Sequence, residues 1–394
     1  MHDFSQGHFM RPRLEEGYSS PHFQRFLDVK PFAPVREFSN ADETLPTRTS
    51  QEIGPMQFDT PHSRLLRPAR QGFRMATLVL LTVLLIAPFA GASQHAQAQT
   101  PHKLKVVASF SILSDWLQNV AGDKIELKTL VPAGGDTHSF DPSPDQVADI
   151  AEADLVFEIG AGFETWLDDV FDSSGTNATR IVVSDGVKLR TLADADAETH
   201  GDAHAGATPS NDQSQGSTDP HIWGNVQNAI IAVNNIADAL SAADPDNAAT
   251  FKENAAGYVA QLQTLDGWVR TEVDKLPQDK RQLVTSHDAL GYFTDAYGFT
   301  IVGTALGTTT EEAEPSARQI SQLVDQIKAS GVKAIFAENI ENPALMKSIA
   351  DEAGVTVGPV LYTDALGEPG TDGDTYIKAI TYNANSIVNA LLGQ

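Results

Sequence analysis

The sequence predicts an α/β fold in which two lobes with parallel sheets are joined by a single long, rigid helix. Short β-type runs alternate with helical patterns between residues 103 and 184, and a second alternating series extends from 282 to 392. Between these series, residues 225–275 are helical in pattern. Strands that alternate with helices form parallel sheets covered by helices. The roughly 300 residues after position 98 are also too many for one small core, so two lobes are expected.

The first series predicts the N-terminal lobe, residues 103–242. Its strands are expected at 103–110, 125–131, 155–159 and 180–184. The first helix ends just before Gly122 and carries apolar residues on one face at helical spacing: Ile112, Leu113, Trp116, Leu117 and Val120. Two further helices are expected at 144–153 and 163–171.

The helical middle predicts the connection between the lobes. A first helix is expected at 225–242, and a linking helix at 246–275 carries apolar residues at helical spacing. About 29 helical residues would extend roughly 43 Å, which is the span of two small lobes. The C-terminal lobe, residues 280–394, repeats the alternation. Its strands are expected at 282–286, 300–306, 334–337 and 356–361, with helices starting at 289, 316, 343 and 374.

The first hundred residues predict export. Four arginines precede an apolar run of 15 residues, Ala76–Ala90, and Ala96-Gln97-Ala98 resembles a cleavage site. The run is shorter than the roughly 20 residues of a membrane-spanning helix, so a signal peptide at 75–98 is favoured over an uncleaved anchor. Residues 1–74 show no periodicity. They are interpreted as an extension from a start codon assigned too early, or as a disordered cytoplasmic tail.

Charge and cysteine content limit the function classes. The chain has 27 Lys+Arg against 52 Asp+Glu, a net charge of −25, and no cysteine. An acidic surface repels nucleic acid and anionic lipid and concentrates cations, although it also simply keeps an exported protein soluble. Without cysteine, disulfides, thiolate ligands and a lipobox are ruled out. We expect a soluble, monomeric periplasmic protein without a lipid anchor.

Candidate metal ligands stand at the ends of predicted elements. Three of them follow predicted strands and one precedes the helix at 225: His138, His287 and Asp364, and then His221. In open α/β sheets, ligands bind where the loops beyond the carboxyl ends of strands converge. A single histidine would more often be a surface or hydrogen-bonded residue. Three imidazoles with one carboxylate, however, form the ligand set of a closed, four-coordinate metal site, with zinc the first candidate.

Five motifs around these residues follow one another along the chain: Lys105-Val-Val-Ala-Ser-Phe-Ser-Ile-Leu, Gly135-Asp-Thr-His138-Ser-Phe-Asp-Pro-Ser-Pro, Asp219-Pro-His221-Ile-Trp, Ser286-His287-Asp-Ala-Leu-Gly-Tyr-Phe and Leu361-Tyr-Thr-Asp364-Ala-Leu. Over about residues 103–394, the chain closely resembles the periplasmic solute-binding proteins of zinc and manganese ABC importers. The resemblance implies two α/β lobes with the metal between them, His138 and His221 from the first lobe and His287 and Asp364 from the second. It also implies an inner-membrane ABC permease as partner.

The identity of the metal depends on position 287. The resemblance implies that manganese members carry glutamate there and zinc members histidine. Zn²⁺ favours nitrogen ligands and Mn²⁺ favours oxygen, so Zn²⁺ is expected as the transported ligand, with Mn²⁺ as the alternative. Three neutral imidazoles and one carboxylate leave a zinc site at net +1. Asp288 or Glu338 is a candidate to offset this charge or orient an imidazole, although both are equally typical of caps and surface charges.

Residues 192–218 contain His200 and His204 among acidic and small residues, without an apolar period. They predict a mobile loop. Zinc-importer proteins that resemble this chain often carry a His- and acid-rich loop at this point, thought to capture metal, but a plain acidic linker explains the segment equally well.

After zinc-binding and manganese-binding proteins, an enzyme is the third hypothesis for the function. Catalytic zinc keeps an open coordination position, and the chain contains neither H-E-x-x-H nor G-x-S-x-G. A periplasmic zinc hydrolase would require that Asp364 is not a ligand and that Glu338 acts as a base. We therefore expect a binding protein rather than an enzyme.

Overall fold

The computed structural model describes residues 103–191, 218–307 and 315–394. The expected extension at 1–74, the expected signal peptide at 75–98, and His200 and His204 lie outside the described residues. Contacts group Pro101–Gln394 into one compact unit, which contains every element considered below. Within the described ranges, no helix is both long enough and apolar enough to span a membrane.

The chain first builds a four-stranded parallel sheet in the order β2-β1-β3-β4. Its strands are β1 (Leu104–Phe110), β2 (Ile125–Val131), β3 (Leu155–Glu158) and β4 (Thr179–Val182). The connecting helices are α2 (Ser111–Ala121), α3 (Pro144–Ala151) and α4 (Leu167–Ser174). The last five residues of β1 are all buried, as expected for a central strand covered on both faces.

Helix α4 begins later than the sequence predicts. A helix was expected at 163–171, but α4 starts at Leu167, and the chain reaches Phe163 through a turn in which Gly160, Ala161 and Gly162 have φ angles of 76°, 55° and 85°. Ala161 is the one non-glycine residue with positive φ in the described part of the chain. The turn is fixed by the buried carboxylate of Glu164, which accepts hydrogen bonds from the backbone N–H groups of Ile159 and Gly160.

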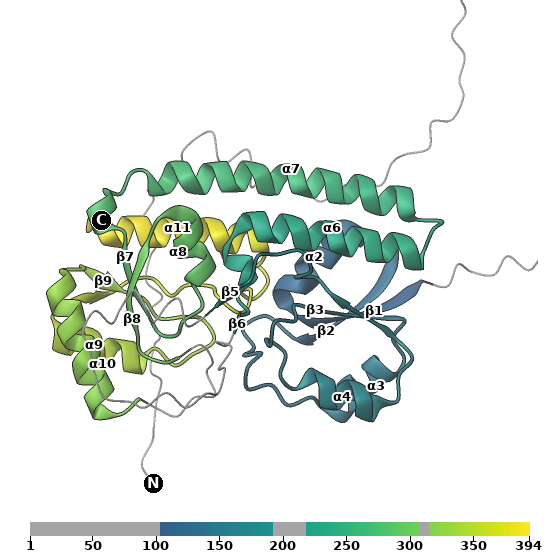
Figure 1. Ribbon diagram of the computed structural model, residues 1–394, viewed down its shortest axis with the longest axis horizontal. Helices are drawn as coiled ribbons and strands as arrows, with labels where there is room; N and C mark the ends of the chain where they lie inside the picture. Colours follow the sequence, from purple (N-terminus) through teal and green to yellow (C-terminus); the bar gives the residue numbers. More distant parts are fainter. Residues whose placement is uncertain (1–102, 192–217, 308–314) are drawn as a thin grey trace, which may run out of the picture. The chain divides into compact units, whose positions relative to one another are not determined.

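Two helices follow the first sheet and a short antiparallel pair, β5 (Arg190–Thr191) with β6 (Thr218–Asp219). After the 3-10 turn η1 (Ile222–Gly224) come α6 (Val226–Ala243) and α7 (Ala248–Val273). Helix α7 has 26 residues, which corresponds to about 39 Å. It packs on α2 and α6 near one end and on α8 and α11 near the other (Figure 1). One continuous apolar core therefore extends under α7 through both halves of the fold.

The second half repeats the α/β alternation in shorter strands. They are β7 (Gln282–Thr285), β8 (Thr300–Thr304), β9 (Ala334–Ile335) and β10 (Thr356–Val357). The helices are α8 (Gly291–Tyr297), α9 (Ala317–Ser330), α10 (Ala344–Ala353) and α11 (Tyr376–Leu392). Strand β7 pairs with β8 and β9 with β10, both in parallel, and the N–H of Phe336 donates to the carbonyl of Val284 and so joins the two pairs.

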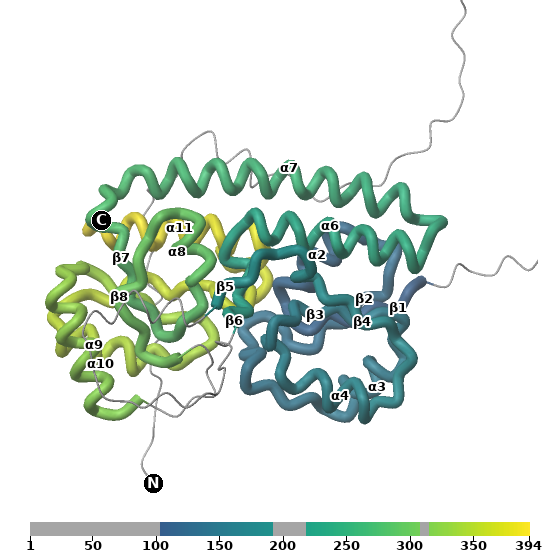
Figure 2. Tube along the Cα trace, viewed as in Figure 1, coloured from purple at the N-terminus to yellow at the C-terminus, as the bar shows by residue number. Residues whose placement is uncertain are grey.

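The predicted α/β fold with parallel sheets is confirmed, and Figure 2 follows the chain through both series. Strand β10 is shorter than the predicted 356–361, because Pro359 has no N–H to donate to a ladder. Hydrogen bonds from the backbone N–H groups of Gly358 and Leu361 still continue the pairing on either side of this proline. The division of the chain into lobes at 103–242 and 280–394 stays a prediction.

Candidate metal site

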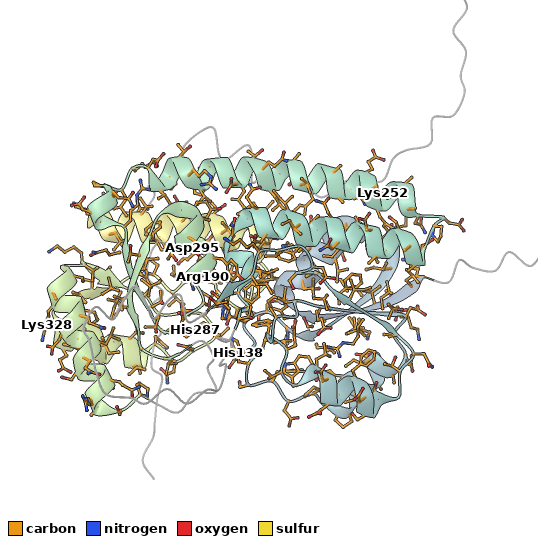
Figure 3. The ribbon with its side chains drawn as sticks, viewed as in Figure 1. His138, Arg190, Lys252, His287, Asp295 and Lys328 are labelled. Atoms are coloured by element: carbon orange, nitrogen blue, oxygen red, sulfur yellow. The ribbon has the colours of Figure 1, made fainter. Side chains whose placement is uncertain are left out.

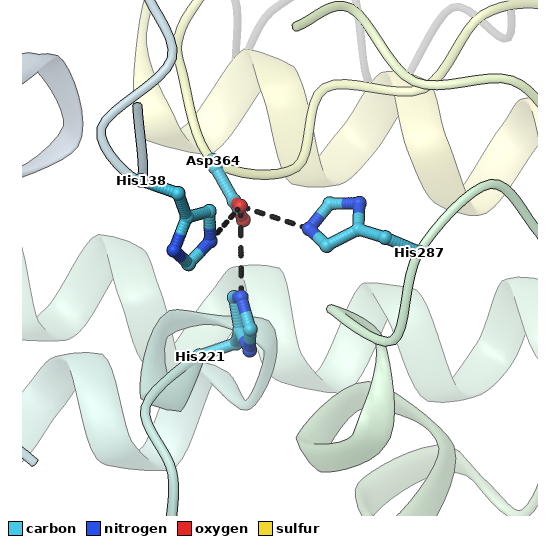
Figure 4. A group of neighbouring side chains, drawn as sticks. All are labelled: His138, His221, His287 and Asp364. Carbon is cyan, nitrogen blue, oxygen red and sulfur yellow. Dashed lines mark hydrogen bonds and ion pairs between the residues drawn. The ribbon is translucent and has the colours of Figure 1, made fainter. Parts of the chain in front are cut away.

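The four side chains predicted as ligands lie together and are buried (Figure 4). One donor atom of each lies within 4.8 Å of those of the other three. The Nε2 atoms of His138, His287 and His221 lie 3.1, 2.9 and 3.5 Å from Oδ2 of Asp364. Donor atoms bound to a tetrahedral zinc ion at about 2.0–2.1 Å are roughly 3.3 Å apart. The spacing of the four donor atoms therefore suits a transition-metal ion.

Two of the histidines are positioned by the same local turn. The carboxylate of Asp136 accepts the backbone N–H of His138 at 2.9 Å, and that of Asp219 accepts the backbone N–H of His221 at 3.0 Å. Aspartate commonly forms such turns with the backbone two residues on. The Asp-x-His pattern thus directs both imidazoles away from their elements and toward the centre.

The Nδ1 side of His221 rests on Asp219. Nδ1 lies 2.8 Å from Oδ1 of the fully buried Asp219 carboxylate, whose Oδ2 lies 3.3 Å from Nη1 of Arg190. Burial acts to raise the pKa of Asp219, but the hydrogen bond and charge of His221, together with Arg190, hold that pKa below its usual value. A carboxylate on Nδ1 fixes the tautomer and leaves Nε2 free for a metal.

The Nδ1 side of His287 rests on Glu338, 2.7 Å from its Oε2. Oε1 of Glu338 accepts the hydroxyl of Ser286 and the backbone N–H of His287, each at 3.0 Å. A second carboxylate, that of Glu341, lies 3.4 Å from the same Nδ1. Of the two carboxylates that the sequence offers as supports, Glu338 lies beside an imidazole. Asp288, the other candidate, forms no hydrogen bond or ion pair with any of the four predicted ligands among the described residues.

These charges set the protonation of the metal-free site. Burial acts to lower the pKa of His221, but the carboxylates of Asp364 and Asp219 outweigh it and raise that pKa to about 9. For His287, Glu338 and Asp364 likewise outweigh burial, and the pKa lies well above its usual value. Burial acts to raise the pKa of Asp364, yet the two histidines hold it well below the usual range. A metal ion that binds here must displace protons.

An aromatic wall closes the first-sheet side of the site. The ring of Phe163 meets that of His138 edge-on at 5.1 Å between centroids, and the ring of Trp223 meets that of His221 at 5.3 Å. Phe163 and Trp223 pack on each other at 4.7 Å. Sequence reasoning missed this wall, and it also missed Asp219 and Arg190. Asp219 and Trp223 flank His221 inside the motif Asp219-Pro-His221-Ile-Trp. No pattern in the sequence pairs Phe163 or Arg190 with the site.

The segment Thr363–Leu366, which carries Asp364, is hydrogen-bonded to both halves of the fold. Toward the second half, the side chain of Asn339 accepts the N–H of Thr363 and donates to the carbonyl of Ala365. Three bonds tie the segment to the first half: Trp223 Nε1–H to the Thr363 carbonyl, the Leu366 N–H to the Ser111 hydroxyl, and the Gly134 N–H to the Leu366 carbonyl.

Residues 106–390 match the family model described as ZnuA, zinc-uptake complex component A, periplasmic. The chain belongs to this family. Proteins of this family are extracytoplasmic metal-binding components of ABC transporters rather than enzymes.

Three relatives illustrate the family. The chain is 31% identical over 315 residues to the manganese-binding lipoprotein MntA of Halalkalibacterium halodurans, covering 80% of this chain and 97% of MntA. It is 32% identical over 324 residues to the manganese ABC transporter substrate-binding lipoprotein PsaA of Streptococcus pneumoniae, covering 81% and 99%. The structure of the periplasmic zinc-binding protein TroA of Treponema pallidum superimposes with a TM-score of 0.64 at 29% identity, covering 74% and 99%. The relatives thus differ in the metal that their names give.

Proposed function

We propose that this protein captures Zn²⁺ in the periplasm and delivers it to an ABC permease in the inner membrane. The observation that carries the proposal is the donor set: three imidazole Nε2 atoms face one carboxylate oxygen. Nitrogen-rich sets with a single carboxylate favour borderline-soft Zn²⁺ over Mn²⁺. In this proposal His138, His221, His287 and Asp364 are the four ligands.

The charges around the donor set support a divalent cation. Zn²⁺ with three neutral imidazoles and Asp364 has a net charge of +1, and the Glu338 carboxylate behind His287 offsets it. Asp219, behind His221, is already balanced by Arg190. With Glu341 also counted, the ionised group has a net charge of −1 when a divalent ion is present and −3 when it is absent, so the ion reduces the excess of buried negative charge.

Manganese is the second candidate. The names of MntA and PsaA favour it. Oδ1 of Asp364 favours it as well, because this buried oxygen has no hydrogen bond among the described residues and is available as a second oxygen ligand. Against manganese stands His287, where the family resemblance implies glutamate in manganese members.

A zinc hydrolase is not favoured. The base that the sequence suggested, Glu338, lies against Nδ1 of His287, on the side of the ring opposite the Nε2 atom that faces Asp364. There it supports a histidine and is not directed at the space between the ligands. We further propose that the protein is free in the periplasm, unlike its lipoprotein relatives, because a lipobox requires a cysteine and the chain has none. That it acts as a monomer stays a prediction.

The proposal is tested by metal competition. Protein freed of metal by unfolding with a chelator is refolded, offered equimolar Zn²⁺ and Mn²⁺, dialysed and analysed for metal. One zinc ion per chain with little manganese is the expected result, and equal retention of both metals would contradict the zinc assignment. For delivery, a strain lacking the gene should grow poorly in chelator-treated medium and recover with added zinc but not with manganese.

A further inference from the structure

We infer that Arg190 is a positioning residue for metal capture, which acts through Asp219 on His221. The inference rests on the proposed function and concerns a residue 31 positions away from the histidine it serves. Three side chains form a continuous series: the guanidinium of Arg190, 3.3 Å from Oδ2 of Asp219; the carboxylate of Asp219; and Nδ1 of His221, 2.8 Å from Oδ1. On the other side of the ring, Nε2 of His221 faces Asp364.

Helix α8 holds this series from the side of the second half. The hydroxyl of Tyr292 accepts the backbone N–H of Arg190 and donates to the carbonyl of Asp219, each at 2.9 Å. Nε of Arg190 also lies 3.1 Å from Oδ2 of Asp295, one turn further along α8 (Figure 3). Arg190 thus connects the segment that carries His221 to the helix that follows His287.

The backbone of α8 also leaves room for the ion pair. A Cβ atom on Gly291, the first residue of α8, would overlap both the guanidinium of Arg190 and the carboxylate of Asp219. The ion pair therefore packs directly on the main chain of α8, and its position leaves no space for any residue other than glycine. Such close packing restricts the Asp219 carboxylate to one orientation.

An arginine suits this role because its charge is permanent and its planar donors hold a carboxylate in a defined direction. Asp219 is fully buried. Without Arg190, Oδ1 of Asp219 would still accept the backbone N–H of His221 and face its ring, but Oδ2 would lose its side-chain partner among the described residues, and the carboxylate could rotate and shift the imidazole. The imidazole of His221 would then no longer present Nε2 to the metal in the required direction.

The test is a double-mutant cycle of Arg190→Gln and Asp219→Asn, measured by competitive titration with Zn²⁺ and by the visible absorption of bound Co²⁺. Arg190→Gln should weaken zinc by about 10-fold or more, as expected for a residue that supports a ligand, and should alter the Co²⁺ spectrum. In the Asp219→Asn background, the same change should alter zinc affinity by less than about 2-fold, because residues that act through one another are not additive.

Arg180→Gln is the matched control. Arg180 also pairs with a buried acidic group, Glu158, at 2.6 Å, but on β3 and β4. Its loss should lower the unfolding temperature of the metal-free protein and leave zinc affinity and the Co²⁺ spectrum unchanged. If Arg190→Gln fails to fold, Arg190→Lys takes its place in the cycle, with a smaller loss expected because the charge is kept.

Two outcomes would contradict the role of Arg190 without contradicting the proposed function. Equal losses of affinity from Arg190→Gln in both backgrounds would show that it does not act through Asp219. A lower unfolding temperature with unchanged affinity and spectrum would show a purely structural ion pair. A wild-type protein that binds neither Zn²⁺ nor Mn²⁺ in the same assay would instead contradict the proposed function, and the role of Arg190 with it.

Discussion

The imidazoles of His221 and His287 are held from behind in two different ways. Behind His221 stands one carboxylate, Asp219, and Arg190 balances it. Behind His287 stand two carboxylates, Glu338 at 2.7 Å and Glu341 at 3.4 Å, with no Lys or Arg paired to either among the described residues. A carboxylate lies within 2.8 Å of Nδ1 in both rings, but the balance of charge behind them differs.

The difference indicates what a bound metal ion replaces. On the His221 side, a permanent cation is part of the protein. On the His287 side, the carboxylates of Glu338 and Asp364 outweigh burial and raise the pKa of His287 well above its usual value, so a proton on the imidazole supplies the positive charge in the metal-free protein. Metal binding exchanges that proton for a divalent ion. His221 also has a raised pKa and must lose its proton, but Arg190 still balances Asp219 after that proton has left. Behind His287, the metal ion itself has to balance the carboxylates.

The largest effects are expected from removing the proposed ligands. His221→Ala and His287→Ala should each weaken zinc by well over 100-fold, above the roughly 10-fold to 100-fold typical of supporting residues. His138→Ala should do the same, and Asp364→Ala should match or exceed all three, because Asp364 approaches every imidazole. Competition with a chelator of known affinity measures these losses. A ligand variant with near-normal affinity would remove that residue from the site.

Replacing the carboxylates behind the two imidazoles should affect zinc binding and protein stability differently. Asp219→Asn and Glu338→Gln should each weaken zinc by about 10-fold to 100-fold. Only Asp219→Asn leaves a partly buried arginine without its buried partner, so it should destabilise the metal-free protein by about 1–3 kcal/mol, while Glu338→Gln, which relieves repulsion from Glu341, should cost less than about 1 kcal/mol. Chemical denaturation without metal gives both values. The reverse order would contradict the contrast between the two sides.

Affinity for zinc should depend on pH up to unusually high values. The usual histidine pKa of about 6.5 would end proton competition near neutrality, but the pKa of His221 is raised to about 9. Zinc affinity should therefore keep rising with pH to about 9. By the same linkage, the metal-free protein should lose stability as pH rises from about 6.5 through about 9, because the folded state loses a proton that it holds more tightly than the unfolded chain. Titrations between about pH 5 and 10 test both trends, and a constant affinity above about pH 7 would contradict the raised pKa.

The smallest change expected is a shift in metal preference. His287→Glu should lower the ratio of zinc to manganese affinity by about 10-fold or more, because an oxygen donor replaces a nitrogen. The gain in absolute manganese affinity should be modest, since the new carboxylate would join Glu338, Glu341 and Asp364. Parallel titrations with both metals check this, with Arg180→Gln as the unaffected control. An unchanged ratio would show that position 287 does not set the preference.

Much of the site is predictable from sequence because three of its four predicted ligands follow strands. Strand β2 at 125–131 and the helix end at Gly122 match the predicted positions. His138, His287 and Asp364 follow β2, β7 and β10, which belong to separate parallel sheets, and the loops after these strands converge on His221. The His221 support is different. Arg190 lies 29 residues before Asp219, and its other partners on α8 are more than 100 residues away. No periodicity encodes such contacts, which arise only when the two halves pack together.

Two local differences between the predicted and the observed structure also arise from contacts that the sequence pattern does not encode. Glu164, which was expected inside the helix, instead accepts hydrogen bonds from the backbone N–H groups of Ile159 and Gly160 at the turn with positive φ at Ala161, and helix α4 starts only at Leu167. A helical pattern of apolar residues does not reveal this conformation. Phe163, which the turn places against His138, was predicted as the first residue of that helix and not as part of the site.

The hydrogen bonds of the segment Thr363–Leu366 affect how a bound metal ion would be released. Family resemblance assigns Asp364 to the second lobe, so parting the lobes would divide the ligands evenly. Yet three hydrogen bonds join this segment to the first half, and two to Asn339 join it to the second. If the second half moved outward while the three hydrogen bonds to the first half stayed intact, His287 would be the one proposed ligand to move away. A bound ion would then keep His138, His221 and Asp364 as ligands, and a donor group of the partner could occupy the vacant position.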